Sequence, residues 1–115
     1  MSGLINLVNW SDGLGDLYDV AAVGEIAPGE AKLVEAGGKE IALFNCDGDY
    51  YALDNDCTHV GGPLCEGDIT GDTVICPWHG SEFSIRTGEV IGPPADEDVN
   101  SYKVRIEDDR VLVEI

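Results

Sequence analysis

Basic residues are scarce in this chain of 115 amino acids. Only six lysines and arginines stand against 23 aspartates and glutamates, which gives a formal net charge of −17 at pH 7. Binding to nucleic acid or to an anionic membrane surface depends on lysine and arginine, so both kinds of partner are excluded. The acidity is explained by plain solubility, by adaptation to high salt, or by attraction to a basic protein surface that weakens as salt rises.

Long apolar runs are also missing. Residues 1–16 contain no lysine or arginine, and polar residues interrupt their apolar stretch, so this segment does not resemble a targeting signal. No run approaches the roughly 18 apolar residues that would span a bilayer. The sequence therefore predicts a soluble, cytoplasmic monomer without a membrane segment. We expect an N-terminal extension over residues 1–16 and one folded domain over residues 17–115.

Histidine is the third scarce residue, since His59 and His79 are the only two in the chain. A mononuclear iron site of the kind that oxygenases use would need further histidines, so a complete oxygenase is excluded. The sequence also offers no catalytic acid–base pair. We therefore expect no catalytic residues.

Short strands separated by glycine-containing turns dominate the chain. Gly37-Gly38 is a two-residue hairpin signal, and Asp47-Gly48 and Asp108-Asp109 indicate two further reversals. No segment shows a sustained helical period, and at most a single turn is expected near residues 24–26. The pattern predicts an all-β fold, a small antiparallel sandwich or barrel. The predicted strands cover residues 17–23, 31–36, 39–45, 50–53, 73–75, 83–85, 102–106 and 111–115.

Four residues indicate the chemistry. Cys57 and His59 form a Cys-Thr-His box, and sixteen residues later Cys76 and His79 form a Cys-Pro-Trp-His box. Each box offers a thiolate and an imidazole, as two adjacent irons would need. Side chains at positions i and i+2 of an extended segment point the same way, roughly 6–7 Å apart at the backbone. That spacing suits two neighbouring irons better than one zinc ion, whose structural sites usually leave two or more residues between ligands.

The other two cysteines, Cys46 and Cys65, lie outside the boxes. A disulfide framework is one possibility for a chain with four cysteines. Because two of the four belong to the boxes, we expect Cys46 and Cys65 to be small buried hydrophobic residues in a reducing compartment.

With these two boxes the sequence resembles the Rieske-type ferredoxins, whose pattern is Cys-x-His, about sixteen residues, then Cys-x-x-His. The resemblance implies one [2Fe–2S] cluster, held by two loops at one end of a small β-sandwich or barrel called the Rieske fold. Cys57 and Cys76 would bind one iron, and His59 and His79 the other. Two thiolates leave the oxidised cluster neutral, whereas four would give it a charge of −2. Rieske potentials therefore lie at about −150 to +300 mV, against about −400 mV for plant-type clusters.

The same resemblance assigns roles to residues around the boxes. Ser81 matches a serine that donates a hydrogen bond to a bridging sulfide, and Trp78 would be a packing lid. Gly61 and Gly62 would let the backbone approach the sulfides. Pro93 lies in a proline loop, residues 92–94, that would cover the cluster.

Two departures from the family pattern bear on the reduction potential. The tyrosine expected two residues after the serine is Phe83 here, which has no hydroxyl group. Gly62 and Trp78 stand where the high-potential members carry two cysteines that form a disulfide. We therefore expect a potential in the lower half of the Rieske range.

The resemblance implies a one-electron carrier, the ferredoxin component of a bacterial multicomponent ring-hydroxylating dioxygenase that degrades aromatic compounds. Such a protein takes electrons from a flavin-dependent ferredoxin reductase and passes them to a terminal oxygenase, here through an exposed His59/His79 edge. Three alternatives stay open at this point. They are a small subunit of assimilatory nitrite reductase, a ferredoxin of a diiron monooxygenase, and a structural zinc or interaction module.

Overall fold

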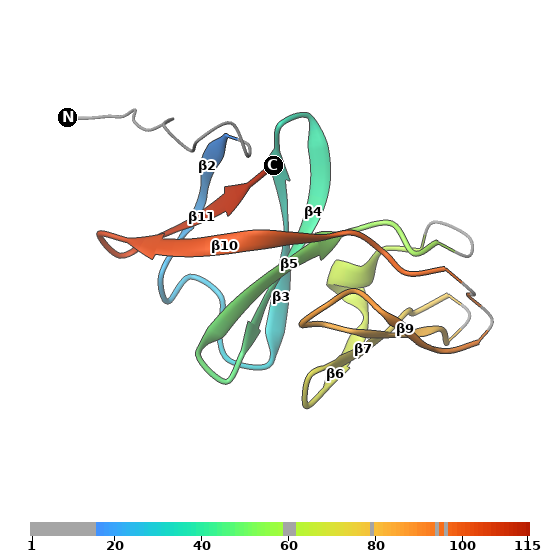
Figure 1. The fold of residues 1–115 in the computed structure, drawn as a ribbon. Helices are drawn as coiled ribbons and strands as arrows, with labels where there is room; N and C mark the ends of the chain where they lie inside the picture. Colours follow the sequence, from blue (N-terminus) through green and yellow to red (C-terminus); the bar gives the residue numbers. More distant parts are fainter. Residues whose placement is uncertain (1–15, 59–61, 79, 94, 96) are drawn as a thin grey trace.

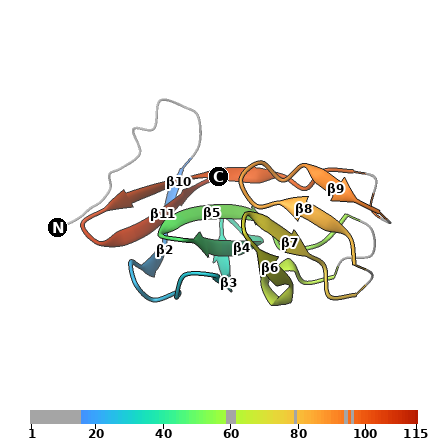
Figure 2. The ribbon, with the colours of Figure 1, turned by 90° about the horizontal axis from the view of Figure 1, so that it is seen from below.

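The computed structural model describes residues 16–58, 62–78, 80–93, 95 and 97–115. Its strands form one six-stranded and one four-stranded sheet, and every strand pairing is antiparallel (Figures 1 and 2). The six-stranded sheet has the order β2-β11-β10-β5-β4-β3. Its strands are β2 Leu17–Ala22, β3 Glu30–Ala36, β4 Lys39–Cys46, β5 Asp49–Asp54, β10 Ser101–Glu107 and β11 Arg110–Glu114.

The four-stranded sheet has the order β6-β7-β8-β9 and lies beside the larger sheet, on the right in Figure 1. Its strands are β6 Asp68–Thr70, β7 Thr73–Ile75, β8 Glu82–Ser84 and β9 Val90–Gly92, and the 3-10 turn η2 Leu64–Glu66 precedes them. In the larger sheet the outer strands β2 and β3 contact each other, so that sheet is a nearly closed barrel. The predicted all-β sandwich or barrel is confirmed.

Strand β4 is buried on both faces and separates two hydrophobic cores. Ile41 and Leu43 point into one core, and Ala42 and Phe44 point into the other, as the alternation of a strand requires. The barrel core consists of Ala21, Ile26, Val34, Ala36, Ile41, Leu43, Ala52, Val111 and Val113. The loop core consists of Ala42, Phe44, Cys46, Leu53, Cys57, Leu64, Val74, Cys76, Phe83, Ile85, Ala95 and Val99.

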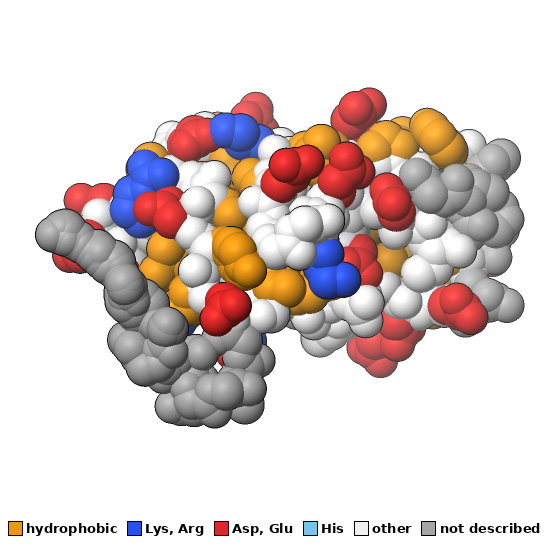
Figure 3. Space-filling model, turned by 90° about the horizontal axis from the view of Figure 1, so that it is seen from above, with side chains coloured by type: hydrophobic (Ala, Val, Ile, Leu, Met, Phe, Trp, Pro, Cys, Tyr) orange, Lys and Arg blue, Asp and Glu red, His pale blue; other side chains and the backbone are white. Residues whose placement is uncertain are grey.

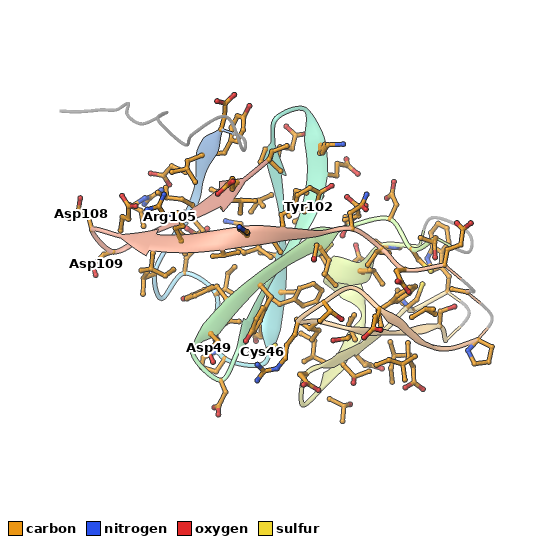
Figure 4. The ribbon with its side chains drawn as sticks, viewed as in Figure 1. Cys46, Asp49, Tyr102, Arg105, Asp108 and Asp109 are labelled. Carbon is orange, nitrogen blue, oxygen red and sulfur yellow. The ribbon has the colours of Figure 1, made fainter. Side chains whose placement is uncertain are left out.

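The predicted two-residue turns are confirmed. Gly37 and Gly38, which join β3 to β4, have φ angles of +59° and +81°. Asp108 and Asp109, at the tip of the β10–β11 hairpin in Figure 4, have φ angles of 50° and 63°. Two successive positive φ angles are typical of the type I′ turn, whose twist matches that of the flanking strands.

Several local predictions need correction. Strands β6 and β9 and the turn η2 were not predicted, because three residues are too few to show a period and, unlike the equally short β7 and β8, they do not border the second ligand box. Val23 lies in a turn after β2, and residues 24–26 do not form a helical turn. Cys46 is buried as expected, but Cys65 is only half-buried at the edge of the loop core.

None of the helical segments among the described residues has the length and apolar character of a membrane span.

A hydrogen-bonded carboxylate joins the end of β5 to the start of β10. The Tyr102 hydroxyl donates to Asp54 Oδ1 at 2.6 Å, and the Asn100 N–H donates to Asp54 Oδ2 at 3.2 Å. Burial of the phenol raises the pKa of Tyr102 to about 12, and the hydrogen bond and negative charge of Asp54 act in the same direction.

This contact predicts a loss of stability at alkaline pH. The folded-state pKa of Tyr102 is raised, so its contribution is complete below the unfolded pKa of about 10 and is lost as pH rises from about 10 to 12. Between about pH 10 and 12 we therefore expect the free energy of unfolding to fall less for Tyr102→Phe than for the wild type. Ultraviolet titration should show one late-ionising tyrosine that is absent from Tyr102→Phe but present in Tyr51→Phe. Identical titrations for wild type and Tyr102→Phe would refute this.

Candidate metal centre

The first ligand loop, residues 57–62, leaves the end of β5 and returns to η2. Asp56 and Pro63 form an isolated antiparallel bridge, and inside it the Cys57 N–H donates to the Gly62 carbonyl oxygen at 2.9 Å. These contacts close the loop at its base and fix the backbone of Cys57. His59 and Gly61 lie outside the described residues.

The second ligand loop, residues 76–81, joins β7 to β8. The Cys76 N–H donates to the Ser81 carbonyl oxygen at 2.7 Å, and the Gly80 N–H donates to the Cys76 carbonyl oxygen at 3.1 Å. Cys76 therefore lies at the base of a tight turn that continues the β7–β8 ladder. His79 lies outside the described residues, so the pairing of the two imidazoles stays a prediction.

The two box cysteines come together in the loop core. Cys57 is 3% exposed and Cys76 is 2% exposed, and both belong to the same buried group of side chains. They arrive from loops on opposite sides of η2 in the sequence. The fold thus places two thiols in one apolar, water-poor site.

Direct contact between the two loops occurs at Gly62. A Cβ atom built on Gly62 would lie 2.6 Å from Cys76 Sγ, 3.2 Å from Trp78 Cγ and 3.3 Å from Trp78 Cβ. Only glycine fits this position without displacing the Cys76 thiol. Trp78 packs on Gly62 but is itself 57% exposed, so it covers the contact only partly.

The same distances fit the two positions, Gly62 and Trp78, at which the resemblance expects a pair of disulfide-forming cysteines. In a disulfide the two Cβ atoms lie about 3.5–4.5 Å apart, close to the 3.3 Å separation here. Two cysteines at these positions would be near bridging distance, which agrees with the disulfide that the resemblance places there.

A third segment, the loop after β9, is tied to the second ligand loop through Ser81. The Ser81 side chain is fully buried, and its Oγ accepts a hydrogen bond from the Ala95 N–H at 2.9 Å. A hydroxyl group also has one hydrogen to donate. Among the described residues no acceptor for that hydrogen is present. Pro93 is exposed in the turn after β9, and Pro94 lies outside the described residues.

The two cysteines outside the boxes are free thiols. Burial raises the pKa of Cys46, and the negative charge of Asp72 adds to the effect. Burial likewise raises the pKa of Cys65, together with the charge of Glu66. The raised pKa keeps both side chains protonated as thiols at neutral pH.

One polar residue near the first loop was missed by the sequence reasoning. Asn55 is only 4% exposed, and its Oδ1 accepts a hydrogen bond from the Cys65 N–H at 3.0 Å. It stands in the polar run Asp54-Asn55-Asp56, which reads as an ordinary loop. Nothing in that run distinguishes a buried asparagine from its exposed neighbours.

Positive charge is concentrated away from the ligand loops. Arg86 is the only basic residue between Lys39 and Lys103 in the sequence. It pairs with Asp72 at 3.2 Å, at the end of the β7–β8 hairpin opposite the second ligand loop. Figure 3 shows one face on which blue side chains lie toward the barrel and the centre, whereas the ligand-loop end at the right carries red and orange ones.

The comparisons with known proteins agree with the two boxes. Residues 16–103 match the Rieske [2Fe-2S] domain. The biphenyl dioxygenase ferredoxin subunit of Pseudomonas sp. (strain KKS102) is 42% identical, over 81% of this chain and 86% of that protein. The ferredoxin component of the naphthalene 1,2-dioxygenase/salicylate 5-hydroxylase systems of Ralstonia sp. is 36% identical, over 84% of this chain and 93% of that protein.

Solved structures show the same fold. One chain in the complex of reduced oxygenase and oxidized ferredoxin in carbazole 1,9a-dioxygenase aligns with a TM-score of 0.81 and 28% identity, over 85% of this chain and 92% of that one. The two box motifs, the all-β architecture and relatives that match nearly end to end lead to one conclusion. This chain belongs to the Rieske [2Fe–2S] family and is a Rieske-type ferredoxin, an electron-transfer protein that resembles the ferredoxin components of aromatic ring-hydroxylating dioxygenase systems.

Proposed function

We propose that this protein takes single electrons from a flavin-dependent ferredoxin reductase and passes them to the terminal oxygenase of a ring-hydroxylating dioxygenase. The observation that carries the proposal is the burial of Cys57 and Cys76 in one apolar site between two hydrogen-bonded loops. The relatives named above are ferredoxin components of such systems, and one solved relative is in complex with its oxygenase.

We propose Cys57, His59, Cys76 and His79 as the four ligands of the [2Fe–2S] cluster. When bound, the cluster supplies a centre that accepts and releases one electron. Two thiolates and two imidazoles are the donor set of a Rieske centre. Two described features fit such a group. Gly62 leaves space beside the Cys76 sulfur that a side chain would fill, and the buried Ser81 hydroxyl has a hydrogen to donate to a sulfide.

Electron exchange would take place at the loop end of the molecule. We propose that partners dock over the edge formed by His59 and His79, beside the exposed Trp78. The acidic surroundings of this end suit a partner with a basic docking surface, and the docking rate would fall as salt rises. The free thiols of Cys46 and Cys65 fit a reducing compartment, so we place the protein in the cytoplasm. Residues 1–16 would be an extension outside this unit.

The first test compares Cys76→Ala with Cys46→Ala. Both side chains are buried in the loop core, but only Cys76 belongs to a ligand box. Anaerobically purified wild type and Cys46→Ala should contain iron and acid-labile sulfide and show an anisotropic paramagnetic signal after reduction. Reduced protein should then pass its electron to a dioxygenase terminal oxygenase in stopped-flow mixing, more slowly at higher salt. Cys76→Ala should lose the cluster. Wild-type protein without sulfide or without the signal would overturn the proposed function.

A second prediction concerns the space at Gly62. In Gly62→Ala the new Cβ would lie 2.6 Å from Cys76 Sγ, so a proposed ligand must move. We expect iron and sulfide per protein to fall by about half or more, because the overpacking costs about 1–3 kcal/mol. The control is Gly37→Ala in the β3–β4 turn, outside the ligand loops, whose Cβ would lie 3.2 Å from Ile115 Cγ2. Equal cluster contents in the two variants would contradict the close approach.

A third prediction concerns Phe83, which is fully buried opposite Val74 in the β7–β8 ladder. Phe83→Tyr restores the hydroxyl group that the family places near the cluster. One net hydrogen bond is worth roughly 0.5–1.5 kcal/mol, so the potential should rise by about 20–65 mV on voltammetry. Phe44→Tyr, in the same core but on β4, should leave the potential unchanged. An unchanged or lower potential in Phe83→Tyr would count against its role.

A further inference from the structure

Asn55 forms hydrogen bonds through its backbone N–H, its carbonyl oxygen and its side chain. Its backbone N–H donates to the Glu40 carbonyl oxygen at 3.1 Å, which extends the β4–β5 ladder by one residue. Its own carbonyl oxygen accepts the Leu64 N–H at 2.7 Å, and its side-chain Oδ1 accepts the Cys65 N–H at 3.0 Å. All of these groups lie at the base of the first ligand loop.

The two N–H groups that Asn55 accepts belong to η2, the 3-10 turn that ends the loop. The first N–H groups of any helical turn have no partner within that turn. The residue before η2, Pro63, makes no side-chain hydrogen bond that caps it. Asn55 therefore caps this turn from across the loop, and it joins the departing and the returning chain in one residue.

The base of the loop is fastened to two strands. Asn55 is attached to β4 through Glu40, and the preceding residue, Asp54, is attached to β10 through Tyr102 and the Asn100 N–H. From this base the Asp56–Pro63 bridge and the Cys57–Gly62 hydrogen bond continue the pairing toward the box. The position of Cys57 is thus set by a short series of paired residues that begins at Asn55.

We propose that Asn55 is a positioning residue for the cluster: through its side-chain bond to the Cys65 N–H it sets the geometry of the first ligand loop. The inference rests on the proposed function. Groups behind a metal's ligands orient those ligands and tune the metal, and the hydrogen bonds made to cluster sulfurs help set the potential. A shift of Cys57 and of the loop backbone would change the orientation of this ligand and the hydrogen bonds made to the cluster sulfurs. Asn55 therefore acts on the redox centre without touching it.

The chain provides a matched control in Asn45. It is also 4% exposed, its carbonyl oxygen accepts the Gly29 N–H at 2.7 Å, and its Oδ1 accepts the Gly48 N–H at 2.8 Å. Its amide nitrogen donates to the Ile26 carbonyl oxygen at 2.7 Å. Asn45 lies beside the β4–β5 turn, near the labelled Cys46 and Asp49 in Figure 4, away from the ligand loops.

The experiment compares Asn55→Ala with Asn45→Ala as purified, cluster-containing proteins. Asn55→Ala loses one side-chain hydrogen bond and Asn45→Ala loses two, so both should melt at a lower temperature than the wild type. Only Asn55→Ala should shift the reduction potential, the visible circular dichroism and the g-values of the reduced cluster. Its cluster should also be lost to an iron chelator about tenfold faster than that of Asn45→Ala, well below either melting temperature.

Equal potentials, spectra and loss rates in the two variants would overturn the role of Asn55. Wild-type protein that carries no cluster would instead overturn the proposed function, so the two failures are distinguishable. If Asn55→Ala does not fold, hydrogen exchange of the wild type decides the question. Peptides that contain Leu64 and Cys65 should be as protected as those from β4, and rapid exchange there would refute the proposal.

Discussion

Strand β4 is the element on which the rest of the structure depends, because it is buried on both faces. Side chains on one face pack in the barrel core, and side chains on the other face pack in the loop core. Cys57 and Cys76 both belong to the loop core, although they come from separate loops. Each loop therefore buries its cysteine in the same core, next to the same central strand.

That arrangement is stabilised from three sides by hydrogen bonds. The first loop is closed by the Asp56–Pro63 bridge, the second by the Cys76–Ser81 pair, and the segment after β9 is joined to the second through Ser81 Oγ. The two ligand loops meet where Gly62 packs against Trp78. Packing and hydrogen bonds hold them together there, since none of the described cysteines forms a disulfide.

Local sequence signals predicted the fold where they were strong. Glycine and aspartate pairs fixed the two-residue hairpins, and alternating apolar residues placed the long strands within one or two residues. Strands β6 and β9 were missed because three residues are too few to display a period, whereas the equally short β7 and β8 were found because they border the second ligand box. Cys65 was expected to be buried and is half-buried, because the 3-10 turn that carries it lies at the edge of the core.

The ligand boxes were readable from the sequence because donor type and spacing are local properties. Their surroundings were not, since they depend on contacts between distant segments. The bond from the Ala95 N–H to Ser81 and the one from the Cys65 N–H to Asn55 join residues 14 and 10 positions apart. No periodicity marks such pairs, and the sequence alone does not distinguish a buried asparagine from an exposed one.

The six basic residues are unevenly placed over a chain that is acidic throughout. Apart from Arg86, all of them lie on the strands of the barrel, whereas the ligand-loop end carries exposed carboxylates such as Asp56, Glu66 and Glu97. The ligand-loop end therefore presents carboxylates with few basic side chains between them, a surface that attracts a positively charged protein over a long range. Such attraction speeds the encounter of two proteins more than it tightens their complex, so a bound partner is able to leave again.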